Sequence, residues 1–260
     1  MDYQVTTQPS HEPVTLLEAK LYLRVTHSSE DAVIENLIRM ARQEGETYHN
    51  HWWLRRTVTA KIDRFPAKEI RLPGPRLIGI DSITYVDVAG VTQTLATSVY
   101  DVDTSSEPGK ITLAYNQTWP TIRGDHHGIT IVYKAGYVAT CTAADATDLV
   151  TVAAGVYAVG DRVRFYTTDT LPAGLSVDTD YYVITVAGND IQVSATLGGT
   201  TVDITDTGTG THTIDAVPVG YRMAVLSKAL EKYVHRGDDH APTNQMFRDL
   251  LGPDRMVGVQ

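Results

Sequence analysis

Apolar residues recur with the period of an α-helix in three stretches of the chain. "TLLE" at 15–18 has the pattern of a capping box and predicts a short helix that ends near Arg24. A second helix is expected from its N-cap Ser28 onward. Its apolar face comprises Ile34, Leu37, Ile38, Ala41, Tyr48 and Trp52. Residues 218–236 predict a third helix, with Pro218 in its first turn and Gly237 as its stop.

The period of the pattern changes to two after Leu54. Val58, Ala60 and Ile62 alternate with polar residues, which is typical of a half-buried strand. "RLIGIDSITYVDVAGVTQTL" predicts two strands joined by a turn at Ala89–Gly90, with a bulge near Asp81–Ser82. "GKITLAY" and "GITIVYKAG" predict two more strands. Residues 54–136 are therefore expected to form an antiparallel β region.

About 80 residues without a helical period separate "ITIVYKAGY" from the third helix. Short β patterns alternate there with turn signals such as "LPAG" and "AGND". The β patterns are "RVRFY", "YYVITV", "DIQVS", "TVDIT" and "THTI". The pattern indicates a small all-β domain inserted where two ends of a loop lie close together.

The predicted fold class is α+β. A helical core, made of two N-terminal helices and one C-terminal helix, accompanies the antiparallel β region and the inserted all-β domain. The first domain comprises residues 1–137 and 217–260, with a flexible arm at 1–13 and a polar tail at 237–260. The inserted domain comprises residues 138–216. A chain of 260 residues is long enough for two such domains.

The charge of the chain is concentrated in one segment. Residues 138–217 contain two basic residues, Arg162 and Arg164, against ten aspartates, so the segment carries −8 of the total −9. The remainder is nearly neutral and has no basic stripe for tight binding of nucleic acid. The single cysteine, Cys141, excludes an internal disulfide. With no secretory signal and no apolar run of membrane length, we expect a soluble protein that folds in a cytoplasm.

Candidate catalytic and ligand-binding patterns are weak. The phosphate loop, the nucleophile elbow and the "HExxH" motif do not occur. The pairs His49/His51 and His126/His127 lack further metal ligands in the sequence and are interpreted as surface histidines. The aspartates of 138–216 are interpreted as solvated charges and not as a calcium site. The prediction is therefore a protein that is not an enzyme and needs no cofactor and no metal.

Three tryptophans and one cysteine could also mark a site. Trp52 follows the helical face and is expected in the core, whereas Trp53 and Trp119 are expected to be more open, at a ligand or an oligomer interface. Cys141 has no base beside it in the sequence and is not expected to be a catalytic thiol.

Several segments outside the insertion resemble the head–tail connector, or adaptor, proteins of tailed bacteriophages. The resembling stretches are "EPVTLLEAKLYLRV", "SSEDAVIENLIRMARQEGETY", "RFP", "IRLPGPRLIGIDSITYVDVAG", "YDVDTSSEPGKITLAYNQTWP", "ITIVYKAGY" and "VPVGYRMAVLSKALEKYVHR". Their order and spacing carry the resemblance, and the inserted domain departs from it. The insertion is similar to a small β module of phage structural proteins.

The resemblance implies a structural protein in the neck of a virion, assembled in the host cytoplasm. Such adaptors form a homo-oligomeric ring, a dodecamer, beneath the portal protein; they extend the DNA channel and offer a docking surface to neck or tail proteins. A ring of this kind has heterologous interfaces. Genomic DNA would pass without tight binding, and no membrane is involved.

Two expectations concern the parts of the chain that leave the core. The apolar cluster Met246, Phe247, Leu250 and Leu251 in the C-terminal tail is predicted to anchor the subunit on the portal. The acidic insertion is predicted to point away from the DNA channel, where it would also keep free subunits soluble.

Two other functions stay open. One is a tail-completion or tail-terminator protein, whose partner would be the tail tube. The other is a virion protein whose insertion binds a host glycan through the aromatic residues Tyr157, Tyr166, Tyr181 and Tyr182, although strand packing is the favoured account of those tyrosines.

Overall fold

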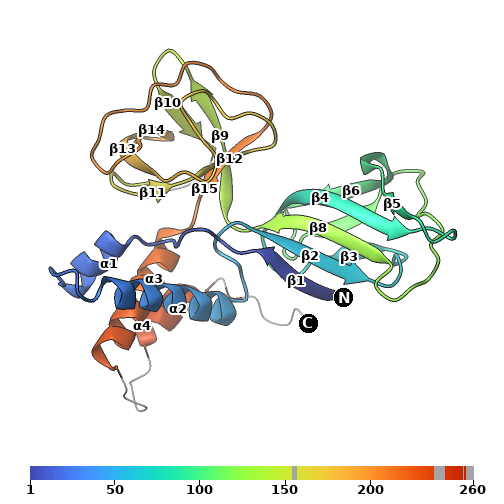
Figure 1. Ribbon diagram of the computed structural model, residues 1–260, viewed down its shortest axis with the longest axis horizontal. Coiled ribbons are helices and arrows are strands. Elements are labelled where there is room, and N and C mark those ends of the chain that lie inside the picture. The colour runs from blue at the N-terminus through green and yellow to red at the C-terminus, as the bar shows by residue number, and fades with distance from the viewer. Residues whose placement is uncertain (154–156, 237–243, 254, 256–260) are drawn as a thin grey trace. The chain divides into compact units, whose positions relative to one another are not determined.

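The structure, a computed structural model, describes residues 1–153, 157–236, 244–253 and 255 (Figure 1). It divides into two compact units. We name them the sandwich unit, residues 1–9 and 50–136, and the helix–barrel unit, residues 10–49 and 137–255. The boundary between the two units, at 136–137, lies next to the predicted domain boundary. The helices, which were predicted to belong to the other domain, lie in the same unit as residues 138–216. The predicted α+β class is confirmed.

The sandwich unit consists of a five-stranded and a three-stranded antiparallel sheet. The larger sheet has the order β1-β2-β8-β4-β5 and the smaller one β3-β7-β6. Their bounds are β1 (Asp2–Thr7), β2 (Arg56–Ile62), β3 (Glu69–Arg71), β4 (Leu77–Val86), β5 (Thr92–Thr94), β6 (Tyr100–Asp103), β7 (Lys110–Leu113) and β8 (Ile129–Ala135). A short 3₁₀ turn, Thr97–Val99, precedes β6.

The core of the sandwich unit follows from the alternation of its strands. In the register of the larger sheet, Val58 of β2 lies opposite Tyr133 of β8, which in turn lies opposite Ile80 of β4. Ile70 and Ile111, from the smaller sheet, close the same core from the other side. The bulge predicted near Asp81–Ser82 is confirmed, since the register between β4 and β8 shifts between Ile80 and Ser82.

In the described residues, the helix–barrel unit contains four helices and seven strands. The helices are α1 (Leu16–Leu23), α2 (Asp31–His49), α3 (Val219–Val234) and α4 (Gln245–Leu251). The strands are β9 (Val138–Ala144), β10 (Leu149–Val152), β11 (Arg162–Val163), β12 (Phe165–Thr167), β13 (Tyr181–Ala187), β14 (Asp190–Ser194) and β15 (His212–Asp215). They form one sheet of order β11-β13-β14-β10-β9-β15-β12.

This sheet curls into a nearly closed barrel. Its two edge strands, β11 and β12, are neighbours in the sequence, and only Arg164 separates them. Two Cα–Cα steps span at most about 7 Å, so the two edge strands of the sheet lie close together. This arrangement limits the exposure of unpaired N–H and C=O groups that an open sheet has at its edges. Figure 1 shows the curled strands. The interior is apolar and is formed by residues such as Val150, Phe165, Val183, Ile191 and Ile214.

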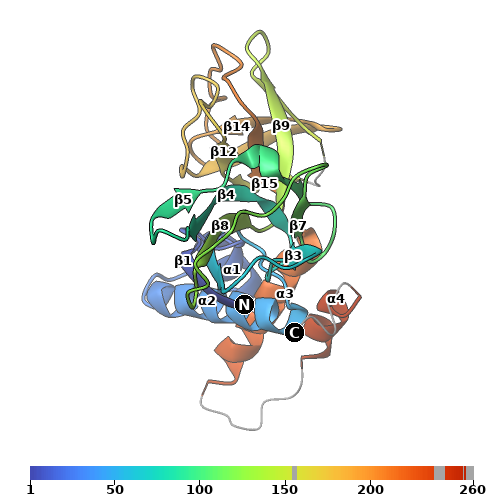
Figure 2. The same cartoon turned by 90° about the vertical axis from the view of Figure 1, so that its right-hand side faces the viewer.

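The helices form a second layer of the same unit. The capping box predicted for α1 is confirmed: the Thr15 hydroxyl accepts from the Glu18 N–H, and the Glu18 carboxylate accepts from the Thr15 N–H at 2.7 Å. Helix α2 begins at Asp31, three residues after the predicted N-cap Ser28, because residues 28–31 close a turn of their own. Figure 2 shows α2 and α3 crossing beneath the barrel strands.

Several expectations on local structure were wrong. The predicted arm 1–13 contains β1, which adds an edge strand to β2, with Tyr3 opposite Ala60. "RVRFY" is two strands and not one, since the chain changes sheet edge at Arg164. "TVDIT" contributes only an isolated bridge at Thr201. The hairpin β9–β10 was not predicted, because its small residues give a weak alternation.

Replacement of Gly136 by alanine should destabilise the sandwich unit by about 2 kcal/mol, because a residue with φ of +142° would be strained and its Cβ would lie 2.7 Å from the backbone of Arg55. Gly79→Ala is the matched control, since that Cβ would meet nothing within 4 Å. Urea unfolding followed by tryptophan fluorescence measures this unit alone, because all three tryptophans lie in it. Equal midpoints for the two variants would contradict the expectation.

Candidate assembly site

The segment 10–12 connects the helices of the helix–barrel unit to its barrel. The Ser10 hydroxyl accepts from the Arg164 guanidinium at 2.5 Å, and the Glu12 carbonyl accepts from Arg162. The His11 Nε2 lies 2.9 Å from the Asp215 carboxylate, and both side chains are almost completely buried. The side chain of Glu12 turns the other way and accepts from Arg42 of α2. Three consecutive residues thus join a helix to two barrel strands.

The two barrel arginines were visible in the sequence as the only basic residues of an acidic segment. In the structure both face Asp180, with Arg164 Nε 2.5 Å and Arg162 Nη1 3.4 Å from its carboxylate. Burial alone would raise the pKa of Asp180, but the hydrogen bond from Arg164 and the two positive charges outweigh it and hold that pKa below its ordinary value. The ion pairs of Asp180 therefore stabilise the folded state at pH values above about 3.9, the pKa of an aspartate in the unfolded chain. This stabilisation decreases as the pH falls below that value.

Arg222 of α3 forms a second connection between helices and barrel. Its Nη2 donates to Glu18 of α1 at 2.7 Å and to Asp161 of the barrel at 2.6 Å. Burial disfavours the charged guanidinium, yet the hydrogen bond to Asp161 and the two negative charges raise the pKa of Arg222 above its ordinary value. Sequence reasoning missed this cluster, because its members lie up to 204 residues apart along the chain.

Four large apolar side chains of α1 and α2 are exposed. Leu17 and Leu21, one helical turn apart on α1, are 49% and 70% exposed, and α1 buries only Ala19. On α2, Val33 and Met40 lie two turns apart and are also exposed. We name these four residues the apolar helix face. Several exposed apolar side chains on two contacting helices are a candidate surface for protein–protein contact.

The four residues predicted as portal anchor lie on α4, where they divide into two pairs. Phe247 and Leu251 are buried within the helix–barrel unit, and the Phe247 ring lies 5.9 Å from that of Tyr48. Asn244 caps the helix by accepting from the Phe247 N–H at 2.9 Å. Met246 is 45% exposed, and Leu250 is half-buried. Two of the four predicted anchor residues therefore pack inside the subunit and are not available to a partner.

Of the other candidate residues, one histidine pair lies in a different environment from the one predicted. His49 and His51 are buried and not on the surface: His49 packs edge-on against Tyr221, with 4.7 Å between ring centroids, and His51 Nε2 lies 3.2 Å from Glu107. His126 and His127 do lie at the surface. Cys141 is buried, and this burial raises the pKa of its thiol to about 12, far from that of a reactive thiolate.

The aromatic residues also differ from expectation. Trp53 is fully buried, whereas Trp52 is half-buried with the Arg56 guanidinium over its ring at 5.3 Å. Trp119 is half-buried and stacks on Phe65. Of the tyrosines proposed as a glycan platform, Tyr166 and Tyr181 are buried, and Tyr157 donates its hydroxyl proton to the Asp215 carbonyl. These three side chains pack the barrel, and the fourth, Tyr182, is half-buried, so the four do not form an exposed platform.

Comparison with known families adds one finding. Residues 13–68 match the model of a family described as "Phage gp6-like head-tail connector protein". The resemblance to head–tail connectors is confirmed. The matched residues contain α1, α2 and β2, and so include the apolar helix face. No protein with curated function matches the chain.

Solved structures show where a similar fold occurs. The chain matches "Neck of empty GTA particle computed with C6 symmetry" with a TM-score of 0.60 and 14% identity. It matches "Virion of native gene transfer agent (GTA) particle" with a TM-score of 0.60 and 15% identity, and "Neck of native GTA particle computed with C12 symmetry" with 0.58 and 14%. Each match covers 100% of this chain and 98% of the other, so the shared fold includes the barrel.

One further observation concerns membranes. Among the residues that the structure describes, no helix combines the length and the apolar character that crossing a bilayer requires.

Replacement of Arg222 by methionine should destabilise the helix–barrel unit by about 3 kcal/mol, because it leaves the buried Asp161 carboxylate without its partner. The α-helices of the described residues all lie in this unit, so thermal loss of the helical circular-dichroism signal measures it. Arg39→Met removes an exposed ion pair of the same unit and should cost less than about 1 kcal/mol. A loss for Arg222→Met no larger than that of the control would refute the structural role of the cluster.

Proposed function

We propose that the chain is a structural head–tail connector that forms a ring in the neck of a tailed phage or phage-like particle, between portal and tail. The observation that carries the proposal is the family match of residues 13–68, in a chain whose whole length has the fold found in neck structures. The ring would extend the DNA channel and provide a docking surface for neck or tail proteins. No enzymatic step is assigned to it.

A closed ring requires that one face of each subunit meet a different face of its neighbour. The apolar helix face offers such a surface. Its residues Leu17 and Leu21 are exposed in the described part of the subunit. The similar structures were computed with C6 and C12 symmetry, and a ring of twelve subunits is the number that we propose. The apolar helix face would then be covered by the adjacent subunit.

The charge distribution supports an orientation for the barrel. Three of its ten aspartates, Asp161, Asp180 and Asp215, are paired with basic groups at the contact with the helices and segment 10–12. The exposed ones are Asp145, Asp169, Asp178, Asp203 and Asp206. A surface of this sign repels DNA, so we place the barrel away from the channel, with the nearly neutral remainder of the chain toward the passing genome.

A second candidate within the virion is a tail-completion or tail-terminator protein. It would use the same ring geometry with a tail-tube partner in place of the portal. The family match favours the connector, because its description names the head–tail connection. The glycan-binding alternative loses support from the buried tyrosines of the barrel.

Replacement of Leu21 by glutamate should reduce incorporation of the chain into particles at least tenfold. A charge buried against an apolar neighbour costs well above the 1.4 kcal/mol that a tenfold change represents. Copies per particle, measured by quantitative mass spectrometry of purified particles, give the result. Leu197→Glu, on a barrel loop and 50% exposed, is the matched control and should be incorporated normally. Normal incorporation of Leu21→Glu would exclude the apolar helix face as the ring interface.

The portal anchor can be tested on the accessible half of the predicted cluster. Deleting residues 238–260 would also remove Phe247 and Leu251 from the core of the unit, so loss of binding would be ambiguous. Met246→Asp leaves that core intact and should weaken binding to isolated portal rings about tenfold, as measured by co-sedimentation. Leu197→Asp, at an exposed leucine on a barrel loop outside both proposed surfaces, serves as the control for charge alone. Unchanged portal binding by Met246→Asp would remove α4 from the docking surface.

A further inference from the structure

Three chain segments meet at one end of the larger sheet of the sandwich unit. Strand β1 begins at Asp2, β2 ends at Ile62, and β8 begins at Ile129. Because β1, β2 and β8 are neighbours and successive pairs are antiparallel, these three strand ends lie at the same end of the sheet. The topology thereby brings Asp2, Asp63 and the loop before β8 together, although up to 125 residues separate them in the sequence.

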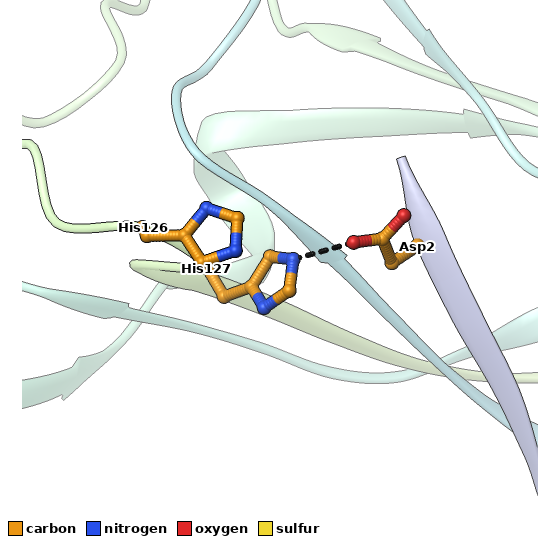
Figure 3. A group of neighbouring side chains, drawn as sticks. All are labelled: Asp2, His126 and His127. Atoms are coloured by element: carbon orange, nitrogen blue, oxygen red, sulfur yellow. Dashed lines mark hydrogen bonds and ion pairs between the residues drawn. The ribbon is translucent and has the colours of Figure 1, made fainter.

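The loop carries two consecutive histidines whose rings lie on the same side. The rings of His126 and His127 stack with 3.7 Å between centroids, and Figure 3 shows both beside Asp2. The His127 Nε2 lies 2.7 Å from Asp2 Oδ2. One ligand atom from each of Asp2, His126 and His127 lies within 4.8 Å of the others. Ligand atoms around a tetrahedral zinc ion are about 3.3 Å apart, so small side-chain rotations would suffice.

The loop is held in place independently of the ligand atoms. The His127 backbone has φ of +58°, a conformation that non-glycine residues adopt rarely. Its N–H donates to Asp63 Oδ1 at 2.7 Å, and the same oxygen lies 3.1 Å from His126 Nδ1. Asp63 thus orients both histidines, as the outer carboxylates of metal sites orient their ligands.

We propose that Asp2, His126 and His127 bind one divalent transition-metal ion, with Zn²⁺ as the ion of choice. Two imidazoles and a carboxylate suit Zn²⁺, Ni²⁺ or Cu²⁺ and do not suit Mg²⁺ or Ca²⁺, which take oxygen ligands. The side chains lie at the surface, so water completes the coordination. The ion ties the edge strand β1 to the loop before β8 and stabilises the end of the sheet. This inference is independent of the connector function.

The test uses the full chain without an affinity tag, freed of metal by a chelator. Titration with ZnCl₂ in a calorimeter should give one ion per chain, and Zn²⁺ should raise the unfolding temperature of the sandwich unit, followed by tryptophan fluorescence. His127→Gln, His126→Gln and Asp2→Asn should each weaken binding at least about tenfold. His27→Gln, an exposed histidine of the other unit, is the matched control and should bind like the parent chain.

Co²⁺ separates this site from weak surface binding. The intense visible absorption of four-coordinate Co²⁺ should appear with the parent chain and with His27→Gln, and disappear with His127→Gln. Because all substituted side chains are exposed or half-buried, the variants should keep the circular-dichroism spectrum of the parent. No heat with Zn²⁺, or equal Zn²⁺ affinity in His127→Gln and the parent chain, would overturn the proposal.

Discussion

The buried ion pairs between helices and barrel are the interactions on which the helix–barrel unit depends. Arg222 bridges Glu18 and Asp161, and segment 10–12 joins Arg42 of α2 to the barrel arginines. Buried charges of this kind add little net stability compared with apolar contacts, but each is costly to leave without its partner. The network therefore favours one position of the barrel on the helices over others. An inserted domain held in this way can present a defined surface in an assembly.

The barrel itself depends on a constraint of connectivity. Because Arg164 alone separates the two edge strands, the sheet has no room to stay open. The same residue carries a guanidinium that pairs with Asp180 and Ser10, so closure of the barrel and its attachment to the N-terminal segment use one side chain. The remaining exposed aspartates leave the rest of the barrel surface acidic, which suits a domain directed away from DNA.

Features that depend on neighbouring residues were predicted correctly from the sequence, whereas features that depend on contacts between distant residues were not. The capping box of Thr15 and Glu18, the bulge in β4 and the stripe of α3 all follow from neighbouring residues. Strand β1 was missed because an edge strand with mostly exposed side chains has the composition of an arm. Phe247 and Leu251 were expected to face a partner, since Tyr48 of α2, which the Phe247 ring contacts, lies far away in the sequence. The cluster of Asp2 with His126 and His127 was invisible for the same reason.

The central claim is that this chain forms a ring in the neck, and one measurement tests it most directly. Cryo-electron microscopy of the intact particle, with reconstruction focused on the region between head and tail, should show a ring of this fold beneath the portal. In that ring α1 and α2 should contact the adjacent subunit, and the barrels should point outward. Absence of the chain from the neck, or its location at the distal tail or on a fibre, would contradict the account.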